Sequence, residues 1–428
     1  MGETSLKDWL SRLENSHPGE IELGLERVSA VAQNLDLFPL KAKVITVAGT
    51  NGKGSTIAAI ESVMLAMGLA VGTYTSPHIT SYNERIRLNG SCAEEVDIVA
   101  AFERIEAVRA ETTLTYFEYG TLAALQVFAN NELDYLLLEV GLGGRLDAVN
   151  IVSADIAVIT SIAIDHTDWL GTNREQIAAE KAGILRPGKV FICGDSNPPQ
   201  ALTDISEQLS CQSYWQGREF RWQQTGSVWS WQGIDINGQS VNLQNLPRGQ
   251  LLPANLATAI QTVCLAEEIP PDTLIQGAFE KLSLTGRQQR FEQQEIEYIL
   301  DVSHNPAAVE SLNKFLVENP AAGRTAAVFS AMSGKDIRGM IQAVAGSVEA
   351  WFIADLPKVP RAATSDELAA ALQECGVQMI SVNKNPRQAL RRAQSLMGPG
   401  DRLVVFGSFH TISEVKSALD KDSKKDAR

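Results

Sequence analysis

The sequence predicts an α/β protein with two parallel-sheet domains, the first larger and carrying a small β insert. Three observations support this fold class. Apolar segments alternate with helical segments up to about residue 200, residues 211–250 change to an alternating pattern rich in Gln, Trp and Gly, and the strand–helix alternation restarts near residue 290. Apolar strands joined by helical crossovers are typical of a parallel sheet that is covered on both faces.

The first predicted strand, Lys43–Ala48, leads into a glycine-rich loop within VITVAGTNGKGST, residues 44–56. A helix is expected over Ser55–Met67, with Gly68 as its stop. Strand, loop and helix together aim backbone N–H groups and a helix dipole at one point, which favours a bound phosphate. The match to G-x-x-x-x-G-K-[ST] is imperfect, because Val47 takes the first glycine position and Gly54 the hydroxyl position. A chance glycine turn is the alternative, and the flanking elements make it the weaker one.

Further strands are predicted at residues 134–141, 154–162 and 189–194, with helices at 94–110 and 120–131 between them. Residues 211–250 are interpreted as a small antiparallel β insert, and residues 253–268 return to a helix. In the second domain the strands are expected at 296–304, 325–332, 350–356, 378–382 and 401–408. The boundary is placed in the polar stretch SLTGRQQRFEQQ, giving domains 1–286 and 287–428. The second domain is interpreted as a Rossmann-like fold.

Composition narrows the function classes. The chain has 428 residues, 44% of them hydrophobic and 21% charged, which is ordinary for a globular protein. Its net charge of −14 argues against non-specific nucleic-acid binding and against an anionic membrane surface. The five cysteines are scattered without a C-x-x-C pair, and the N-terminus lacks an apolar signal core. We therefore expect a cytoplasmic protein with no nucleic-acid or membrane partner.

Four of the five histidines, His78, His166, His304 and His410, follow or end predicted strands. The carboxyl ends of parallel strands are where ligands bind, so this placement favours a site, although any single one could be an ordinary loop histidine. The fifth, His17, lies near the N-terminus.

Two further segments end strands with polar residues. Glu139 in LLLEVGLGGRLDAVN would lie beside the phosphate loop if the two strands are neighbours, where a carboxylate can hold Mg²⁺. Leu146 stands where a dinucleotide motif needs its last glycine, so a ligand-facing turn is preferred there, with a plain tight turn as the alternative. The segment SIAIDHTDWLG can be interpreted in two equally good ways. Its polar residues form a metal-binding or phosphate-binding site, or Asp168 caps the following helix. The pattern around Lys181 alone predicts a solvated lysine.

These motifs together resemble the folylpolyglutamate synthase family, which belongs with the Mur ligases. The resemblance runs nearly end to end and includes LENSHPGEIELGLERV, VAGTNGKGST, TSPHITSYNERIR, LTYFEYGTLAAL, LEVGLGGRLDAVN, TSIAIDHTDWLG, EKAGI, DVSHNP and VFGSFHT. Two departures stand out. Gln288 follows Thr285-Gly286-Arg287 where the family has an aromatic residue, and Ser303 replaces a common alanine. The resemblance implies a P-loop ATPase domain with a β insert, followed by the smaller domain.

The resemblance also implies the site residues. The ATP-binding residues correspond to Thr50, Asn51, Gly52, Lys53, Gly54, Ser55, Asn255, Arg287 and Asp301, with His304 nearby. Two Mg²⁺ sites correspond to Ser76 with Glu139, and to His166 with a carbamylated Lys181. The pterin site corresponds to Glu22, Leu23, Gly24, Leu25, Thr115, Tyr116, Phe117, Glu118, Leu146, Asp147 and Ala148. Lys53, His166 and Lys181 are the expected catalytic residues.

The implied activity is ATP-dependent joining of L-glutamate to 7,8-dihydropteroate and to reduced folates through an acyl phosphate, in a monomer that uses Mg²⁺. Two alternatives stay open. A cell-wall amide ligase of the Mur type shares the phosphate loop, and a P-loop NTPase switch would hydrolyse ATP without ligation. The pterin-like segments favour the first interpretation over the cell-wall enzyme, and the second α/β domain argues against a switch.

Overall fold

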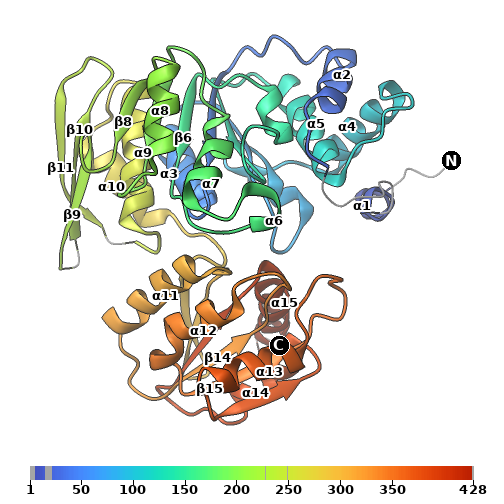
Figure 1. Ribbon diagram of the computed structural model, residues 1–428, viewed down its shortest axis with the longest axis vertical. Coiled ribbons are helices and arrows are strands. Elements are labelled where there is room, and N and C mark those ends of the chain that lie inside the picture. The colour runs from blue at the N-terminus through green and yellow to red at the C-terminus, as the bar shows by residue number, and fades with distance from the viewer. Residues whose placement is uncertain (1–4, 15–21, 227, 248, 427–428) are drawn as a thin grey trace. The chain divides into compact units, whose positions relative to one another are not determined.

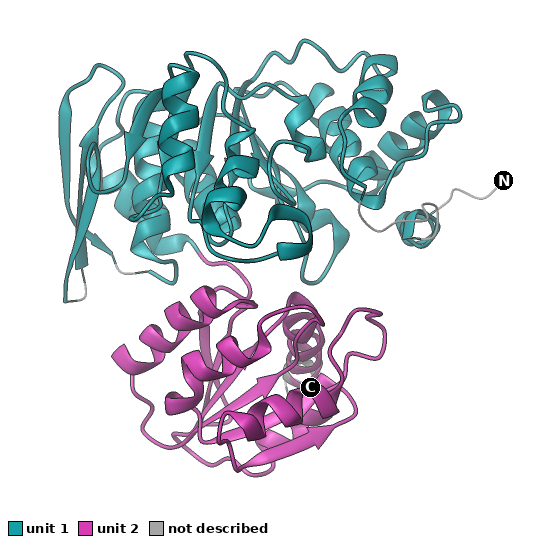
Figure 2. Ribbon diagram, viewed as in Figure 1, with its two compact units in different colours: residues 1–282 teal, residues 283–428 magenta. Residues whose placement is uncertain are grey.

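The computed structural model divides the chain into two compact units, residues 1–282 and 283–428 (Figure 2). It describes residues 5–14, 22–226, 228–247 and 249–426. His17 and residues 15–21 of the first family-like motif lie outside the described residues. The division follows Leu282, whereas the sequence-based boundary was drawn between 286 and 287.

The large sheet of unit 1 has, among the described residues, the strand order β4-β3-β2-β5-β1-β6-β7-β8. The strands are β1 (Lys43–Ala48), β2 (Val71–Tyr74), β3 (Ile86–Leu88), β4 (Ser91–Cys92), β5 (Tyr135–Glu139), β6 (Ile156–Ile159), β7 (Val190–Cys193) and β8 (Gln212–Trp215). All neighbouring pairs from β2 to β8 are parallel, while β3 and β4 extend one edge antiparallel. This confirms the parallel sheet, and it adds an edge hairpin that the sequence analysis did not predict.

Strand β1 lies in the middle of this sheet, between β5 and β6. Val47 pairs with Glu139, and Ala48 pairs with Ile159. The carboxyl ends of these three strands therefore meet at one edge, as parallel pairing requires. This edge receives the glycine-rich loop, Glu139 and the segment that leads to His166.

The helices of unit 1 cover both faces of the sheet (Figure 1). They are α1 (Leu6–Glu14), α2 (Glu26–Asn34), α3 (Lys53–Ala66), α4 (Glu95–Val108), α5 (Tyr116–Ala129), α6 (Thr167–Leu170), α7 (Arg174–Ala182), α8 (Gln200–Gln208), α9 (Pro253–Ala266) and α10 (Asp272–Lys281), with 3₁₀ turns η1 (Tyr82–Arg85) and η2 (Ala148–Ile151). One core packs α1, α2, α4 and α5 against the sheet, and another packs α6, α7 and α8. Helices α3 and α9 are buried almost all round, which is why their sequences lack a polar face.

The predicted β insert is partly wrong in its bounds. Its first strand, β8, joins the large sheet parallel to β7. The antiparallel part consists of β9 (Arg221–Thr225), β10 (Val228–Ile234) and β11 (Ser240–Pro247). Alternate residues of β10 are buried, and Trp229 stacks on Phe279 of α10. The alternating pattern of the sequence is therefore the buried face of this small sheet.

Unit 2 contains a second sheet, described in the order β12-β13-β17-β14-β15-β16. Its strands are β12 (Gln289–Gln293), β13 (Ile296–Leu300), β14 (Thr325–Phe329), β15 (Ala350–Ala354), β16 (Ile380–Asn383) and β17 (Arg402–Phe406). All pairs are parallel except β12 with β13. Residues 289–293, which the sequence analysis assigned to a polar linker, form this antiparallel edge strand instead. An edge strand with one exposed face tolerates polar residues, and this polar sequence is the reason why a linker was predicted here.

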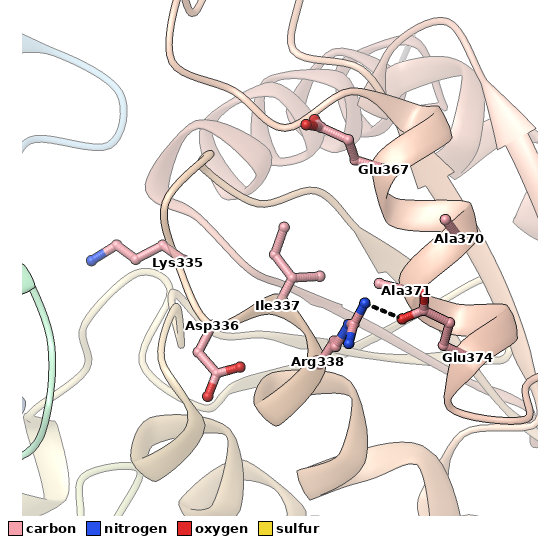
Figure 3. Close-up of a pocket in the computed structure, with 8 residues that line it drawn as sticks. All are labelled: Lys335, Asp336, Ile337, Arg338, Glu367, Ala370, Ala371 and Glu374. Carbon is pink, nitrogen blue, oxygen red and sulfur yellow. Dashed lines mark ion pairs between the residues drawn. The ribbon is translucent and has the colours of Figure 1, made fainter.

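The helices of unit 2 are α11 (Pro306–Glu318), α12 (Ile337–Val344), α13 (Ser365–Glu374), α14 (Pro386–Gln394) and α15 (Phe409–Asp426), with the 3₁₀ turn η3 (Ala345–Ser347). Helices α11, α12 and α13 share one core with the sheet. A shallow hollow opens between α12 and α13, where Arg338 pairs with Glu374 at 2.5 Å (Figure 3). None of its lining residues belongs to the predicted site. Among the described residues, no helix combines the length and apolar character needed to span a membrane.

Candidate functional site

The glycine-rich loop joins β1 to α3 as the sequence predicted. Gly49 has a φ of 148° and Gly52 a φ of 89°, values that favour glycine. Helix α3 begins at Lys53, two residues before the predicted start, so Lys53 and Gly54 lie in its first turn. The Nζ of Lys53 donates to the carbonyl oxygens of Gly49 and Thr50 at 3.1 and 3.3 Å. The lysine thus curls over the loop at a helix N-terminus, an arrangement suited to phosphate.

Side chains from two other segments hold this loop. Thr160 and Ser161, just after β6, donate to the carbonyl oxygen of Asn51 at 2.7 and 3.1 Å. Asn255 of α9 lies against Gly52, because a Cβ built there would come within 2.4 Å of its Oδ1. The structure therefore brings Asn255 to the phosphate loop, although some 200 residues separate them in the sequence.

Ser76 and Glu139 meet beside β1. Glu139 is the last residue of β5 and is only 4% exposed. Its Oε2 accepts a hydrogen bond from the backbone N–H of Ser76 at 2.9 Å. The expected pairing of these two residues at the strand ends is present in the structure.

Lys181 is buried, so the solvated lysine predicted from the helix pattern alone is wrong. Its side chain is 4% exposed, and its Nζ donates to the carbonyl oxygen of Gly49 at 3.0 Å. Burial, followed by the charge of Lys53, lowers the pKa of Lys181 to about 7. A large fraction of this amine is therefore neutral, and hence nucleophilic, near pH 7.

His166 lies at the start of α6, in a left-handed conformation with a φ of 51°. Its side chain is exposed, whereas the neighbouring Asp165 is buried. The charge of Asp165 raises the pKa of Lys181 and so opposes the larger effect of burial. Asp168 is exposed in the first turn of α6, and His166 rather than Asp168 occupies the N-cap position.

Two of the three predicted pterin segments are joined by an arginine that the sequence analysis did not select. Arg27 of α2 forms ion pairs with Glu22 and, at 2.9 Å, with Glu118. Glu118 also completes a capping box with Thr115, accepting its N–H at 2.7 Å and donating its own N–H to the threonine oxygen at 3.2 Å. Residues 22–25 and the start of α5 are therefore fixed to each other.

The third segment lies close to the same helix end. Phe117 covers Gly141, where a Cβ would lie 2.6 Å from the phenylalanine ring. Asp147 is buried and accepts the N–H groups of Leu142 and Val149 at 2.8 and 3.0 Å. Burial raises the pKa of Asp147 to about 6, although these hydrogen bonds oppose the shift. The aromatic ring expected to stack on a flat substrate thus borders the loop of residues 141–148, which also contains Leu146 and Ala148.

This loop packs directly on α7. A Cβ on Gly144 would lie 2.8 Å from the carbonyl oxygen of Lys181, and one on Gly183 would lie 2.3 Å from the Cβ of Arg145. The N–H of Arg145 donates to the carbonyl oxygen of Glu180 at 2.8 Å. The segment that carries Lys181 and the segment that carries Asp147 therefore form one interlocked layer.

In unit 2, the predicted residues Arg287 and His304 lie next to Phe409, the first residue of α15. The guanidinium of Arg287 lies 5.1 Å from the centre of the Phe409 ring, and His304 lies 6.0 Å from it. Asp301 is buried and accepts the N–H groups of Gln288 and Ser303, each at 2.8 Å. Burial raises the pKa of Asp301 above its usual range, while Ser303, Gln288 and Arg287 oppose the shift.

The donors beside the phosphate loop suit a hard divalent cation. A carboxylate, a hydroxyl and an imidazole come from Glu139, Ser76 and His166, and oxygen ligands dominate Mg²⁺ sites. The buried amine of Lys181 is a cation or a neutral base, so it fits such a site only after conversion to an anion.

Sequence reasoning missed Arg27 and Phe409, each held by contacts between distant segments. Phe409 falls within the family motif VFGSFHT, but the motif alone did not assign it a function. Arg27 lies two residues after Leu25, the nearest selected residue, and falls within the motif LENSHPGEIELGLERV, which likewise assigned it no role. Only the fold shows its ion pairs with Glu22 and Glu118.

Comparisons with known proteins give matches over both units of the chain. Residues 47–215 match the Mur ligase middle domain, and residues 286–409 match the Mur ligase glutamate ligase domain. The chain is 41% identical over 415 residues to the dihydrofolate synthase/folylpolyglutamate synthase of Escherichia coli (strain K12), covering 97% of this chain and 96% of that protein. The corresponding enzyme of Bacillus subtilis (strain 168) is 28% identical, with 93% and 95% covered.

Solved structures of such enzymes are similar over almost the whole chain. E. coli FolC in complex with DHPP and ADP matches with a TM-score of 0.91 at 40% identity, covering 98% of both chains. The bifunctional folylpolyglutamate synthase/dihydrofolate synthase with Mn, AMPPNP and L-glutamate bound matches with a TM-score of 0.89 at 41% identity, covering 97% of this chain and 98% of the other. A further structure, from Yersinia pestis CO92, matches with a TM-score of 0.89 at 42% identity and the same coverage.

Proposed function

The chain belongs to the dihydrofolate synthase/folylpolyglutamate synthase family of Mur-type ligases, and from this premise we propose how its residues act. The enzyme is an ATP-dependent ligase that joins L-glutamate to dihydropteroate and adds further glutamates to reduced folates. It uses a divalent metal ion together with ATP. The observation that carries the residue-level proposal is the convergence of the phosphate loop, Glu139 and Lys181 at one edge of the large sheet.

A carboxylate and an amine do not condense in water without activation. The substrate carboxylate attacks the γ-phosphorus of ATP, and ADP leaves as an acyl phosphate forms. The amine of glutamate then attacks the acyl carbon, and the tetrahedral intermediate expels phosphate and loses a proton to give the amide. The phosphate-loop residues Thr50–Ser55 bind the nucleotide phosphates, and Lys53 neutralises the charge that builds on the transferring group.

Two Mg²⁺ ions would be held by Ser76 with Glu139 and by His166 with Lys181. Bound there, they would supply charge neutralisation and orientation of the phosphate oxygens. The amine of Lys181 becomes a ligand after its neutral form attacks CO₂, forming an N–C bond and releasing one proton to leave an anionic carbamate. Its lowered pKa of about 7 supports this step, since the neutral amine is the reacting form.

The pterin site is proposed at Glu22–Leu25, Thr115–Glu118 and Leu146–Ala148. Support comes from the ion pairs of Arg27 and from the Phe117 ring, which can stack on a flat heterocycle. Asn255 in unit 1, and Arg287 with Asp301 in unit 2, are proposed to contact the adenosine part of ATP, with His304 beside them. We also propose that the enzyme is a cytoplasmic monomer without nucleic-acid or membrane partners.

The comparisons favour this ligase over both alternatives. The relatives described above, which match almost the whole chain, are folate ligases by name rather than cell-wall enzymes. The glutamate ligase domain in residues 286–409 is not needed by a switch. The test is ADP release by the purified protein with Mg²⁺, ATP and glutamate, using dihydropteroate in one series and tetrahydrofolate in another. We expect release with both. ADP release with tetrahydrofolate alone would show that the protein does not use dihydropteroate. ADP release with neither substrate would refute the proposed ligase activity.

A further inference from the structure

A buried arginine that contacts both a proposed pterin segment and the segment after Ser76 has no part in the mechanism above. Arg85 ends the 3₁₀ turn η1 and is only 8% exposed. Its guanidinium lies 5.4 Å from the ring centres of both Tyr82 and Tyr116. Its Nε donates to the Nδ1 of His78 at 2.9 Å. The side chain is therefore held rigidly by two aromatic faces and one hydrogen bond.

The charge of this arginine has no counter-ion in the described part of the chain. The nearby Glu84 is committed elsewhere, because its oxygens accept the N–H groups of Ile79, Thr80 and Ser81, each at 2.8 Å. The Nε of Arg85 uses its hydrogen on His78, while the terminal nitrogens donate to no described group and are not sealed from solvent. Arg85 as a whole is 8% exposed, and its terminal nitrogens have donors left for an anionic group, which a guanidinium binds well.

The position of Arg85 indicates which anion this is. Tyr116 belongs to the proposed pterin site, and His78 follows Ser76, a proposed metal ligand, by two positions. Arg85 therefore contacts both the proposed pterin segment and the segment that carries Ser76, the two places that a bound folate would join. Dihydropteroate offers only the carboxylate that reacts. A folate with a glutamyl tail offers a second, α-carboxylate that does not react, and a guanidinium binds such a group bidentately.

We propose that Arg85 binds the non-reacting α-carboxylate of the glutamyl tail and so serves as a specificity-determining residue for the chain-extending reaction. This inference rests on the proposed function. It predicts that the two activities of the enzyme can be separated at one residue. Glu84 already holds residues 79–81 of the loop by three hydrogen bonds, so the position of the loop does not depend on Arg85 alone.

The first test measures kcat and KM in both reactions for Arg85→Gln, Arg85→Lys and the wild type. Arg104→Gln is the matched control, since Arg104 is exposed on α4. For Arg85→Gln we expect the KM for tetrahydrofolate to rise about 10-fold or more, as for a lost charged hydrogen bond, with the KM for dihydropteroate within about threefold. Arg85→Lys should lie between, and Arg104→Gln should match the wild type. Equal losses with both substrates, or no loss with either, would overturn the proposal.

A second measurement does not depend on turnover. Wild-type protein should bind dihydrofolate more tightly than its α-carboxamide, in which the second carboxylate is neutral, and Arg85→Gln should not distinguish the two ligands. Discrimination that persists in the variant would assign the carboxylate to another residue. Failure of the proposed function is recognised separately, because the wild type would then release ADP with neither substrate.

Discussion

The contact between the phosphate loop and α9 can be tested by adding a single methyl group. In Gly52→Ala the new Cβ would lie 2.4 Å from Oδ1 of Asn255 and 3.0 Å from its Cγ. The residue would also keep a φ of 89°, which costs a non-glycine residue about 1–2 kcal/mol. Asn255 must swing away, at a further cost of about 1 kcal/mol if it leaves its rotamer.

Gly68 provides a matched control at the other end of the same helix. Its φ is 83°, and a Cβ there would meet nothing within 4 Å. Gly68→Ala therefore measures the cost of the backbone strain without a steric clash. This cost is offset by roughly 0.4–1 kcal/mol, because alanine lowers the conformational entropy of the unfolded chain. We expect Gly52→Ala to be less stable than Gly68→Ala by about 1 kcal/mol, and to bind ADP several-fold more weakly if Asn255 contacts the nucleotide.

The assay is urea denaturation of both variants, of Asn255→Ala, and of the double variant Gly52→Ala/Asn255→Ala. Removing the Asn255 side chain should recover about 1 kcal/mol of the loss caused by the new methyl group. Additive effects within about 0.5 kcal/mol would refute the steric argument, as would equal losses in Gly52→Ala and Gly68→Ala.

Variants at three other residues test the site and its surroundings. Lys53→Ala should lower kcat of ligation at least 100-fold in the ADP-release assay, about 3 kcal/mol of transition-state stabilisation, and near-normal ligation would refute the phosphate-loop role. Lys181→Ala should be inactive while Lys181→Glu, which restores an anion, recovers measurable ADP release; equal inactivity of the two would count against the carbamate. Hydrogen bonding from Arg109 lowers the pKa of Glu106 to about 2, below its unfolded value near 4.3. The ionised Glu106 therefore contributes about 1 kcal/mol to the free energy of unfolding, after allowance for solvent screening. This contribution is complete above about pH 5 and is lost as the pH falls toward 2. Glu106→Gln should be less stable than wild type at pH 7 and equal to it near pH 2 by thermal denaturation, and a pH-independent difference would contradict this.

The parts of the fold that sequence predicted best are those fixed by local pattern. Strand β1 has the predicted bounds, because its apolar β-branched residues are buried on both faces and end at Gly49. Edge elements were missed for the opposite reason. Most side chains of residues 86–92 and 289–293 are polar or partly exposed, although Ile86 is buried. The pairing of these strands comes from their neighbours rather than from their own sequence pattern.

The site divides in the same way. The glycine-rich loop could be predicted from residues 44–56 alone, since strand, glycines and lysine are consecutive. The meeting of Ser76 with Glu139 needed the strand order, and the burial of Lys181 needed the packing of α7 on the phosphate loop. Arg85 lies within the motif TSPHITSYNERIR, but its contacts with Tyr82 and Tyr116 appear only in the fold.

The close packing of the 141–147 loop on α7 bears on attempts to change the substrate range of this enzyme. Gly144 and Gly183 have no space for a side chain, since the backbone of Lys181 and the Cβ of Arg145 occupy it. A bulkier heterocycle accommodated by shifting the loop would displace the helix as well. Single-position mutant libraries in this region should therefore yield mostly inactive clones. Libraries that vary residues 143–145 and 180–183 together give compensating pairs a chance to be selected.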